Sequence, residues 1–381
     1  MKVAVLGAGG TIAPAIVRDL AASEEVESLL LLDLDGSRAQ QVASLHGGSK
    51  ARAARTDARA PASDPGSLAR ALEGCDALVN SASYRVNLDA MAACLHAGCH
   101  YLDLGGLYWM TGLQLELDPQ FRRQGLLALL GIGSAPGKTN LMAEAAVREL
   151  VAVDRRSDGA PPAPRIDSVH VSAAGRDLDP PPAFSVPYAL RTLLDELTMR
   201  PVVLRDGRPE EIEPMSEGGV VEFGDPIGTG RTIHTIHSEL RTFGDSFGCR
   251  EASFRLCLAP ALLVELRDLA GAAEAEVRHR AAEAAPPSAR TVSVHLVEAA
   301  AGDRRATVRA VTEPIDAWGL GGGIVSTAAP AAAAVRLLAR EAIEARGALP
   351  PERCVDPAEM FAELEQRGCR FEVTTPEEVR A

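Results

Sequence analysis

The chain has 381 residues, of which 46% are hydrophobic and 24% are charged, and its formal net charge is −13. This length favours two domains, and the apolar content is sufficient for packed cores. The acidic balance argues against nucleic acid or an anionic membrane as a partner, because binding either requires a basic face. The 7 cysteines include no C-x-x-C pair, which indicates free thiols and a cytoplasmic protein. No run approaches the roughly 18 to 20 apolar residues of a membrane span.

The chain begins MKVAVLGAGGTIAPAIVRDL, which predicts a buried strand, a glycine turn and a helix. Gly7 permits a tight turn, and Gly9 lets the backbone approach a pyrophosphate. Gly10, Thr11 and the helix start would supply amide groups to the same phosphates. The third position of the G-x-G-x-x-G pattern is Ile12 rather than glycine, and we expect the helix to sit slightly further out or to be rotated.

An acidic residue at the end of the second predicted strand supports this interpretation. The stretch SLLLLDLD ends a strand at Asp33, whose carboxylate can accept hydrogen bonds from the adenosine ribose. Asp33 would repel a 2′-phosphate, which favours NAD as the cofactor. Ser37 and Arg38 follow closely and could accommodate that phosphate, so NADP stays open. A third strand in 51–60 places Asp57 beside the same site.

Alternating strand and helix patterns continue to about residue 130. Strands are predicted within 76–83, 99–106 and 125–133, and helices within 64–75 and 86–98. The carboxyl ends of parallel strands line the cofactor crevice of a doubly wound fold. We therefore expect Asn80, Ser81 and Ala82 to face the dinucleotide, with Tyr84 close to it.

The pattern changes after a predicted helix at 141–150 and a proline-rich loop or domain seam at 154–165. The following strand patterns indicate an α+β domain with a mixed sheet, and they lie within 168–175, 201–212, 220–226, 252–259, 291–300 and 305–314. Helices are predicted in 265–285, in 324–347 and after the prolines of 349–368. The expected fold class is α/β, a Rossmann-type doubly wound parallel sheet plus this second domain. The expected boundaries are 1–130 for the dinucleotide domain and 131–324 for substrate binding and dimerisation, with 325–381 packing back on the first domain.

One segment of the second domain gathers residues suited to acid–base chemistry. The stretch GRTIHTIHSELRTFGDS is expected to be irregular or a strand. On a strand, His237, Glu239 and Arg241 would share one face and His234 would point the other way. That face could hold a base and a guanidinium for a substrate carboxylate, or it could be an exposed strand edge. The spacing lacks a cysteine or aspartate at typical zinc offsets, so no metal is expected.

Four further residues are candidates for substrate chemistry. Asp103 ends the fifth predicted strand and could hold a substrate ammonium or relay a proton; its alternative role is to cap the following turn. Lys138, in the stretch APGKTN, could bind a substrate carboxylate, although loop lysines are usually solvated. Tyr84 and Tyr188 could each donate a hydrogen bond to substrate, or pack half-buried.

The order of these motifs resembles the saccharopine dehydrogenase family, most of all its short lysine 6-dehydrogenase-type members. The similar stretches are VLGAGGTIAPAIVRDL, DALVNSAS, YLDLGG, GIGSAPGKTN, FSVPYALRTLLDELTMRPVVLRDGRPEEIEPMS and STAAPAAAAVRLLAREAIEARGALPPE. They span nearly the whole chain, and Ile12 is the departure from the first motif. The resemblance implies a two-domain NAD(P)-dependent oxidoreductase that acts at a C–N bond and is often a homodimer.

The leading hypothesis is therefore amine–imine hydride transfer on an amino acid or amine. Asp103 and His237 are its catalytic candidates, and Tyr84, Lys138, Tyr188, Glu239 and Arg241 are its substrate-binding candidates. Two alternatives stay open: a reductase of an enoyl or ketone substrate on the same scaffold, and a non-catalytic NAD(H)-binding protein. The substrate itself and the direction of the reaction are left open by the sequence.

Overall fold

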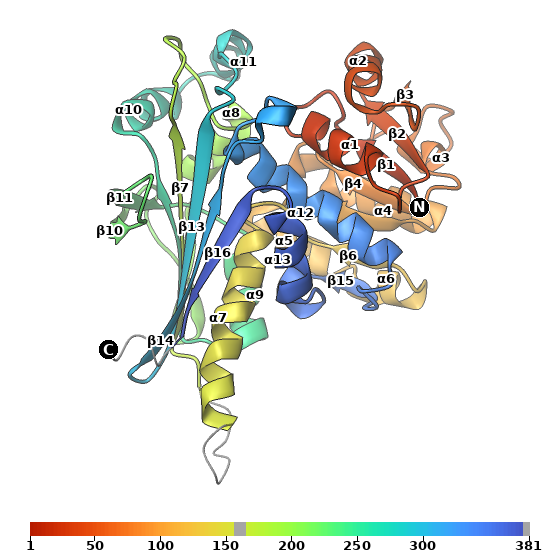
Figure 1. Ribbon diagram of the computed structural model, residues 1–381. Helices are drawn as coiled ribbons and strands as arrows, with labels where there is room; N and C mark the ends of the chain where they lie inside the picture. Colours follow the sequence, from red (N-terminus) through yellow and green to blue (C-terminus); the bar gives the residue numbers. More distant parts are fainter. Residues whose placement is uncertain (156–164, 376–381) are drawn as a thin grey trace. The chain divides into compact units, whose positions relative to one another are not determined.

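The computed structural model describes residues 1–155 and 165–375, which divide into two compact units (Figure 1). The first unit comprises Met1–Lys138 and Thr327–Glu363. The second comprises Thr139–Ser326 and the chain from Leu364 onward. The predicted seam at 154–165 lies almost entirely outside the described residues, and the roles assigned to the predicted domains stay predictions.

A seven-stranded parallel sheet forms the centre of the first unit, in the order β15-β6-β5-β4-β1-β2-β3. Its strands are β1 (Lys2–Leu6), β2 (Ser28–Asp33), β3 (Ala51–Arg55), β4 (Ala77–Asn80), β5 (His100–Asp103), β6 (Leu127–Leu129) and β15 (Gly347–Leu349). The apolar runs of β1 and β2 form central strands because both of their faces are buried. The predicted Rossmann-type sheet is confirmed, and β15 extends its edge beyond β6.

The helices of this unit follow the predicted alternation, with two additions. They are α1 (Ala13–Ala21), α2 (Gly36–His46), α3 (Leu68–Ala71), α4 (Asn87–Ala97), α5 (Leu107–Leu115), α6 (Asp118–Arg123), most of α12 (Gly322–Ala339) and α13 (Pro357–Glu365), with short 3₁₀ helices at Tyr84–Val86 and Pro351–Arg353. The helix predicted to begin at Asp64 begins only at Leu68, where the Ser67 hydroxyl caps it by accepting a hydrogen bond from the Arg70 amide. The helices α5 and α6 are not among the predicted elements.

The helix α12 is long and apolar enough to cross a membrane by length and composition, which differs from the expectation that no run qualifies. Within the structure, 83% of its apolar window is buried. Alanines and aliphatic side chains supply that burial, and this pattern is typical of a core helix.

A buried ionic network joins the N-terminal helix to the end of the first unit. Arg336 donates to Asp19 at 3.0 Å and to Glu363 at 2.7 Å, and all three side chains are almost fully buried. Arg340 extends the network from Glu363, at 2.7 Å, to Glu25, at 2.6 Å. Removing one partner of such a network would leave a buried charge without a counter-ion, which is strongly destabilising. We therefore expect the network to hold these helices in one packing arrangement.

The network predicts a pH-dependent contribution to stability at Glu25. A hydrogen bond from Ser23, with further contributions from Arg340, lowers the pKa of Glu25 to about 2. The folded-state pKa lies below the unfolded value of 4.5, so this contribution is present above pH 4.5 and is lost as the pH falls toward 2. Glu25→Gln should therefore lower the unfolding free energy at pH 7, and urea denaturation should show the difference shrinking as the pH falls below 4.5. Glu24→Gln is the matched control, because the exposed Glu24 side chain has no partner within residues 1–155 and 165–375; an equal loss in both variants contradicts the prediction.

The second unit contains a mixed sheet in the order β10-β11-β12-β7-β13-β14-β16, with β8 and β9 attached beside β12. Its strands are β7 (Ser168–Asp177), β8 (Val202–Arg205), β9 (Arg208–Glu211), β10 (Glu217–Glu222), β11 (Thr229–His234), β12 (Glu251–Cys257), β13 (Thr291–Ala301), β14 (Arg304–Thr312) and β16 (Cys369–Thr374). Its helices are α7 (Lys138–Arg155), α8 (Leu190–Thr198), α9 (Glu239–Phe247), α10 (Pro260–Leu269) and α11 (Glu274–Glu283), with a 3₁₀ helix at Asp316–Trp318. The long strands β7, β13 and β14 lie side by side in Figure 1. The predicted α+β domain with a mixed sheet is confirmed.

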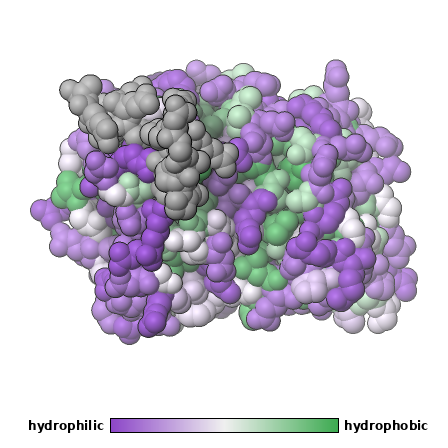
Figure 2. All heavy atoms as spheres, turned by 90° about the horizontal axis from the view of Figure 1, so that it is seen from below, coloured by the Kyte–Doolittle hydropathy of each residue, from purple (hydrophilic) through white to green (hydrophobic). Residues whose placement is uncertain are grey.

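Hydrophilic side chains cover most of the molecular face drawn in Figure 2. This distribution agrees with a chain in which 24% of residues are charged and 46% are hydrophobic. The apolar residues are used mainly in aliphatic cores, such as the cluster of leucines and alanines between β4, β5 and α4.

Candidate functional site

The glycine turn after β1 approaches another part of the backbone so closely that only glycine fits. Gly7 has φ +77°, in the left-handed region, and a Cβ built on it would lie 2.6 Å from the amide nitrogen of Ala82. Its own amide donates to the Leu32 carbonyl at 2.8 Å, which ties the turn to β2. The predicted use of Gly7 for a tight turn therefore has a direct structural reason.

The end of β2 meets this turn through a carboxylate. Asp33 accepts a hydrogen bond from the Gly9 amide at 2.9 Å with one oxygen, and from the Asp35 amide at 2.9 Å with the other. A Cβ on Gly9 would lie 2.8 Å from the Cβ of Arg38. Asp33 and Arg38 thus flank the second glycine of the turn. The acidic side chain would favour NAD and the basic one NADP, so each could influence the choice of dinucleotide.

The start of α1 provides amide groups without partners. Within residues 1–155 and 165–375, the amides of Thr11, Ile12 and Ala13 have no hydrogen-bond partner, whereas the Gly10 amide donates to Gly7 at 2.9 Å. Free amides at a helix N-terminus are suited to an anion. Ala13 is fully buried and Ile12 only half-buried, so the small side chain packs inward in this turn. The residues present fit the pyrophosphate of a dinucleotide.

The remaining cofactor candidates lie at the same edge of the sheet, but they differ in burial and in hydrogen bonding. Ala82 packs against Gly7, and Ser81 bonds to the Leu6 carbonyl through its hydroxyl at 2.8 Å. Asp57 is exposed two residues beyond β3. The Asn80 side chain is buried and donates to Asn87 at 2.9 Å, so its amide is used inside the protein. Tyr84 lies half-buried in the 3₁₀ helix, under the guanidinium of Arg85.

Asp103 lies at the end of β5 as predicted, but its carboxylate is surrounded by protein donors. It accepts hydrogen bonds from five groups: the amides of Gly105 and Gly131, the hydroxyl of Tyr101, and the side-chain amides of Asn87 and Gln114, at 2.6 to 3.2 Å. It is 1% exposed, and burial raises its pKa despite these donors. We infer that Asp103 orders the strand ends; its predicted catalytic role would require one of these bonds to open.

The second unit contains a buried histidine cluster, made of Tyr188, Glu196, His237, Glu239 and Thr139. The imidazole of His237 lies between two carboxylates, with Nδ1 3.5 Å from Glu239 and Nε2 3.9 Å from Glu196. Tyr188 donates to Glu196, and Thr139 donates to Glu239 at 2.8 Å. The ring of His237 also stacks on Phe254, with centroids 3.4 Å apart. The structure thus brings together Tyr188, His237 and Glu239, three of the predicted site residues.

Burial and charge act in opposite directions within this histidine cluster. Burial lowers the pKa of His237, but the adjacent carboxylates of Glu239 and Glu196 more than offset it, so the pKa is raised overall. Burial raises the pKa of Glu196, although the charge of His237 and the hydrogen bond from Tyr188 act to lower it. Buried carboxylates beside an imidazole are the arrangement expected of a group that holds or moves a proton.

The local prediction for 230–246 requires a correction. Only Thr229–His234 is a strand, and Glu239 opens the helix α9, so Glu239 and Arg241 do not share a strand face. Arg241 is partly exposed and lies 3.9 Å from Asp245, one helical turn away. His234 hydrogen-bonds through its backbone to Ser216. Lys138 begins α7 and is 1% exposed rather than solvated in a loop.

Three members of the site were missed by sequence reasoning: Glu196, Thr139 and Phe254. Glu196 occupies an ordinary helix, where an acidic residue carries no distinguishing signal. The helical nature of 239–247 had a signal, because Leu240, Phe243 and Phe247 recur at helical spacing.

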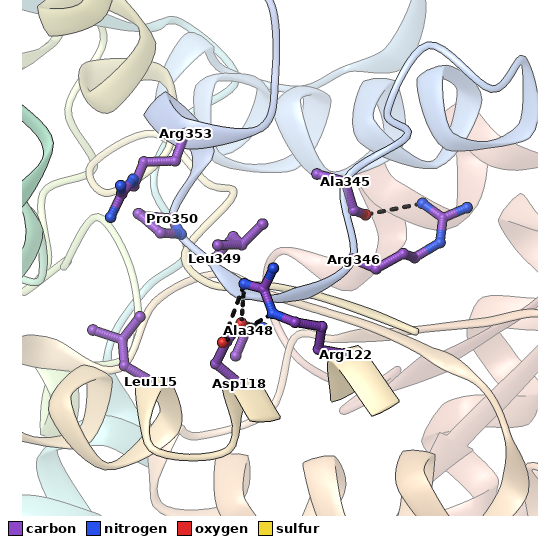
Figure 3. Close-up of a pocket in the computed structure, with 9 residues that line it drawn as sticks. All are labelled: Leu115, Asp118, Arg122, Ala345, Arg346, Ala348, Leu349, Pro350 and Arg353. Atoms are coloured by element: carbon purple, nitrogen blue, oxygen red, sulfur yellow. Dashed lines mark hydrogen bonds and ion pairs between the residues drawn. The ribbon is translucent and has the colours of Figure 1, made fainter. Parts of the chain in front are cut away.

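A cavity of about 470 Å³ lies elsewhere in the first unit, beside β15 (Figure 3). Asp118 pairs with Arg122 and accepts the Ala348 amide at 3.0 Å, so these groups hold the edge strand. Figure 3 shows Arg346 directed toward Ala345 and away from Arg122, so the arginines do not converge on one ligand position. We assign this cavity no chemical role. Among residues 1–155 and 165–375, no three histidine, cysteine or acidic side chains are grouped to hold a metal.

Comparison with known protein families gives a match for the segment that contains the glycine turn. Residues 3–129 match the family described as the saccharopine dehydrogenase NADP-binding domain. This dinucleotide domain is similar to that of the saccharopine dehydrogenase family. The resemblance inferred from the motifs is thereby confirmed, and the cofactor of the domain is a nicotinamide dinucleotide.

A sequence relative and a solved structure are similar to this chain beyond the first unit. Carboxyaminopropylagmatine dehydrogenase from Synechocystis is 26% identical over 280 residues, which are 70% of this chain and 65% of that protein. Saccharopine dehydrogenase (L-Glu forming) from Saccharomyces cerevisiae has a TM-score of 0.67 and 14% identity, over 98% of this chain and 100% of that one. The matched region covers less than two thirds of the Synechocystis protein, and the yeast structure shows a shared fold.

Proposed function

We propose that this protein is an NAD(P)-dependent oxidoreductase that acts on a carbon–nitrogen bond of an amino acid or amine. The observation that carries the proposal is the glycine turn, where Gly7 meets Ala82 and free amides open α1 in a domain similar to that of the saccharopine dehydrogenase family. Both relatives are named dehydrogenases of amine compounds, which supports the substrate class.

Each part of the turn has a proposed role toward the dinucleotide. The pyrophosphate would bind the amides of Thr11, Ile12 and Ala13, with Gly7, Gly9 and Gly10 keeping the backbone accessible. Asp33 would bind the adenosine ribose, Arg38 would approach a 2′-phosphate, and Asp57, Ser81 and Ala82 would line the site. The network around Asn80 would hold its strand end in place.

The proposed acid–base group is His237. When bound, the nicotinamide ring supplies or accepts a hydride at the carbon attached to nitrogen. His237 would take a proton from the substrate nitrogen in oxidation and return it in reduction. Tyr188 and Glu239 would orient the group through their contacts in the histidine cluster, whereas Tyr84, Lys138 and Arg241 stay predictions for substrate binding.

Turnover with amines tests this function. The protein is mixed with NAD⁺ or NADP⁺ and a panel of amino acids and amines at alkaline pH, and reduced cofactor is followed by absorbance. A rise with at least one amine is expected; the reverse panel pairs keto acids with amines. If both panels stay flat while ketone or enoyl substrates react, the reductase alternative is correct, and no turnover at all favours a binding protein.

Cofactor choice provides a second test, with opposed variants on either side of Gly9. Asp33→Ala should raise the Kd for NADH roughly tenfold, about 1.4 kcal/mol for a charge-assisted bond, and affect NADPH less. Arg38→Ala should weaken NADPH more than NADH. Equal losses of both cofactors in Asp33→Ala would show that Asp33 does not contact the ribose.

The wider assignments are also part of the proposal. The chain is expected to be a cytoplasmic homodimer that binds neither nucleic acid nor membrane. A net charge of −13 and seven free cysteines support this placement. Light scattering on the purified protein at several concentrations measures the oligomeric state.

A further inference from the structure

The histidine cluster contains one acidic residue with no assigned role, Glu196. It reaches the cluster from α8, whereas Glu239 comes from α9 and His237 from the segment after β11. The Ile236 amide bonds to the Glu196 carbonyl, which fixes this segment against α8. Two helices thus each bring one carboxylate to the imidazole carried by the segment after β11.

The two charged groups beside the His237 imidazole are both carboxylates. His237 faces Glu239 at 3.5 Å and Glu196 at 3.9 Å, while Phe254 covers its ring face. Asp195 adds a further carboxylate on α8, although it pairs with Arg191 at 3.2 Å. Tyr188 donates to Glu196 and is neutral, since burial raises its pKa well above the usual value.

Two buried polar atoms of the cluster have no hydrogen-bond partner within the described residues: Nε2 of His237 and Oε2 of Glu239. A buried carboxylate without a cationic neighbour is costly, so two carboxylates around one imidazole favour its charged form. A neutral imidazole would leave both acids uncompensated. The arrangement therefore stabilises imidazolium by geometry.

We infer that Glu196 is a positioning residue that, together with Glu239, keeps His237 charged as the proton donor in imine reduction. This inference rests on the proposed function and adds a preferred direction to it. In reduction, the imine carbon gains a hydride from the reduced nicotinamide, and the C=N electron pair moves to nitrogen. His237 then loses its proton to that nitrogen, its N–H electron pair stays on the ring, and solvent returns the proton. Reduction is favoured near neutral pH, and oxidation requires an alkaline pH at which the imidazole is neutral.

The test measures the His237 protonation directly, by NMR of protein labelled at histidine, with the His237 signal assigned through His237→Asn. Glu196→Gln should lower the titration midpoint of His237 by about one unit, because an opposite charge within about 4 Å is lost. At a pH above the His237 midpoints of both the wild type and the variant, the kcat for imine reduction should fall about tenfold. KM should change little. Glu196→Asp should retain most of the midpoint.

Glu283→Gln is the matched control. Glu283 lies 3.3 Å from His279 on the exposed helix α11 and outside the histidine cluster, so this variant should leave the His237 midpoint and the reductive kcat unchanged. If Glu196→Gln does not fold, Tyr188→Phe provides the test instead, because it removes a hydrogen bond that Glu196 accepts. The His237 midpoint should fall in this variant too, by a smaller amount.

The outcomes separate this inference from the function it rests on. A His237 midpoint unchanged in both Glu196→Gln and Tyr188→Phe, in a protein that reduces imines, overturns the inference and leaves the function standing. A lowered midpoint with a matching shift of the reductive pH profile supports it. A lowered midpoint in a protein that turns over no amine or imine overturns both.

Discussion

Gly7→Ala is expected to raise the Kd for NAD(H) and NADP(H) at least tenfold, about 1.4 kcal/mol. The added methyl would lie 2.6 Å from the backbone nitrogen of Ala82, so the turn or β4 must shift. Either shift moves the amides of Thr11 and Ile12 from the phosphate position. Fluorescence titration with each reduced cofactor gives the Kd.

Gly48→Ala controls for the backbone conformation alone. Gly48 also has positive φ, +55°, but a Cβ on it would meet nothing within 4 Å. In both variants an alanine must adopt the left-handed backbone conformation, which costs about 1–2 kcal/mol. Both should therefore have a lower melting temperature. Only Gly7→Ala should lose cofactor. Unchanged affinity in a folded Gly7→Ala protein would contradict the assigned turn.

Asp103→Asn is expected to lower the unfolding free energy by about 3 kcal/mol or more. Replacing one carboxylate oxygen by an amide leaves at least two of the five donors facing another donor, and each stranded donor costs about 1–3 kcal/mol. Urea denaturation followed by circular dichroism measures the loss. The structural role of Asp103 predicts a stability effect larger than any change in cofactor affinity.

Tyr101→Phe is the graded comparison for Asp103. It removes a single donor, whose bond to Asp103 is 2.9 Å, and should cost about 1 kcal/mol. If Asp103→Asn keeps wild-type stability but loses turnover, the catalytic prediction for Asp103 is correct and the structural role is wrong.

The first unit could be predicted in detail because its signals are local. An apolar run followed by glycines and a proline at the first helical turn predicts β1, the turn and α1 without reference to distant residues. The strand ends at Asp33, Asn80 and Asp103 were also located correctly. Their environments were not, because the five donors to Asp103 come from four different segments.

The second unit shows where local reasoning ends. Glu196 comes within reach of His237 only through the packing of α8 against the segment after β11, which no sequence spacing records. The strand β16 pairs with β14 although nearly sixty residues separate them in the chain. The helix α5 was missed because it starts at Leu107 with φ +54° and its apolar residues show no clear period.

Titration of the purified protein with NAD(H) and NADP(H) tests the central claim most directly. The free amides at the start of α1, beside Asp33 and the Gly7 turn, predict saturable binding of at least one cofactor at one site per chain in the micromolar range. If neither cofactor binds at millimolar concentration, the oxidoreductase function is contradicted.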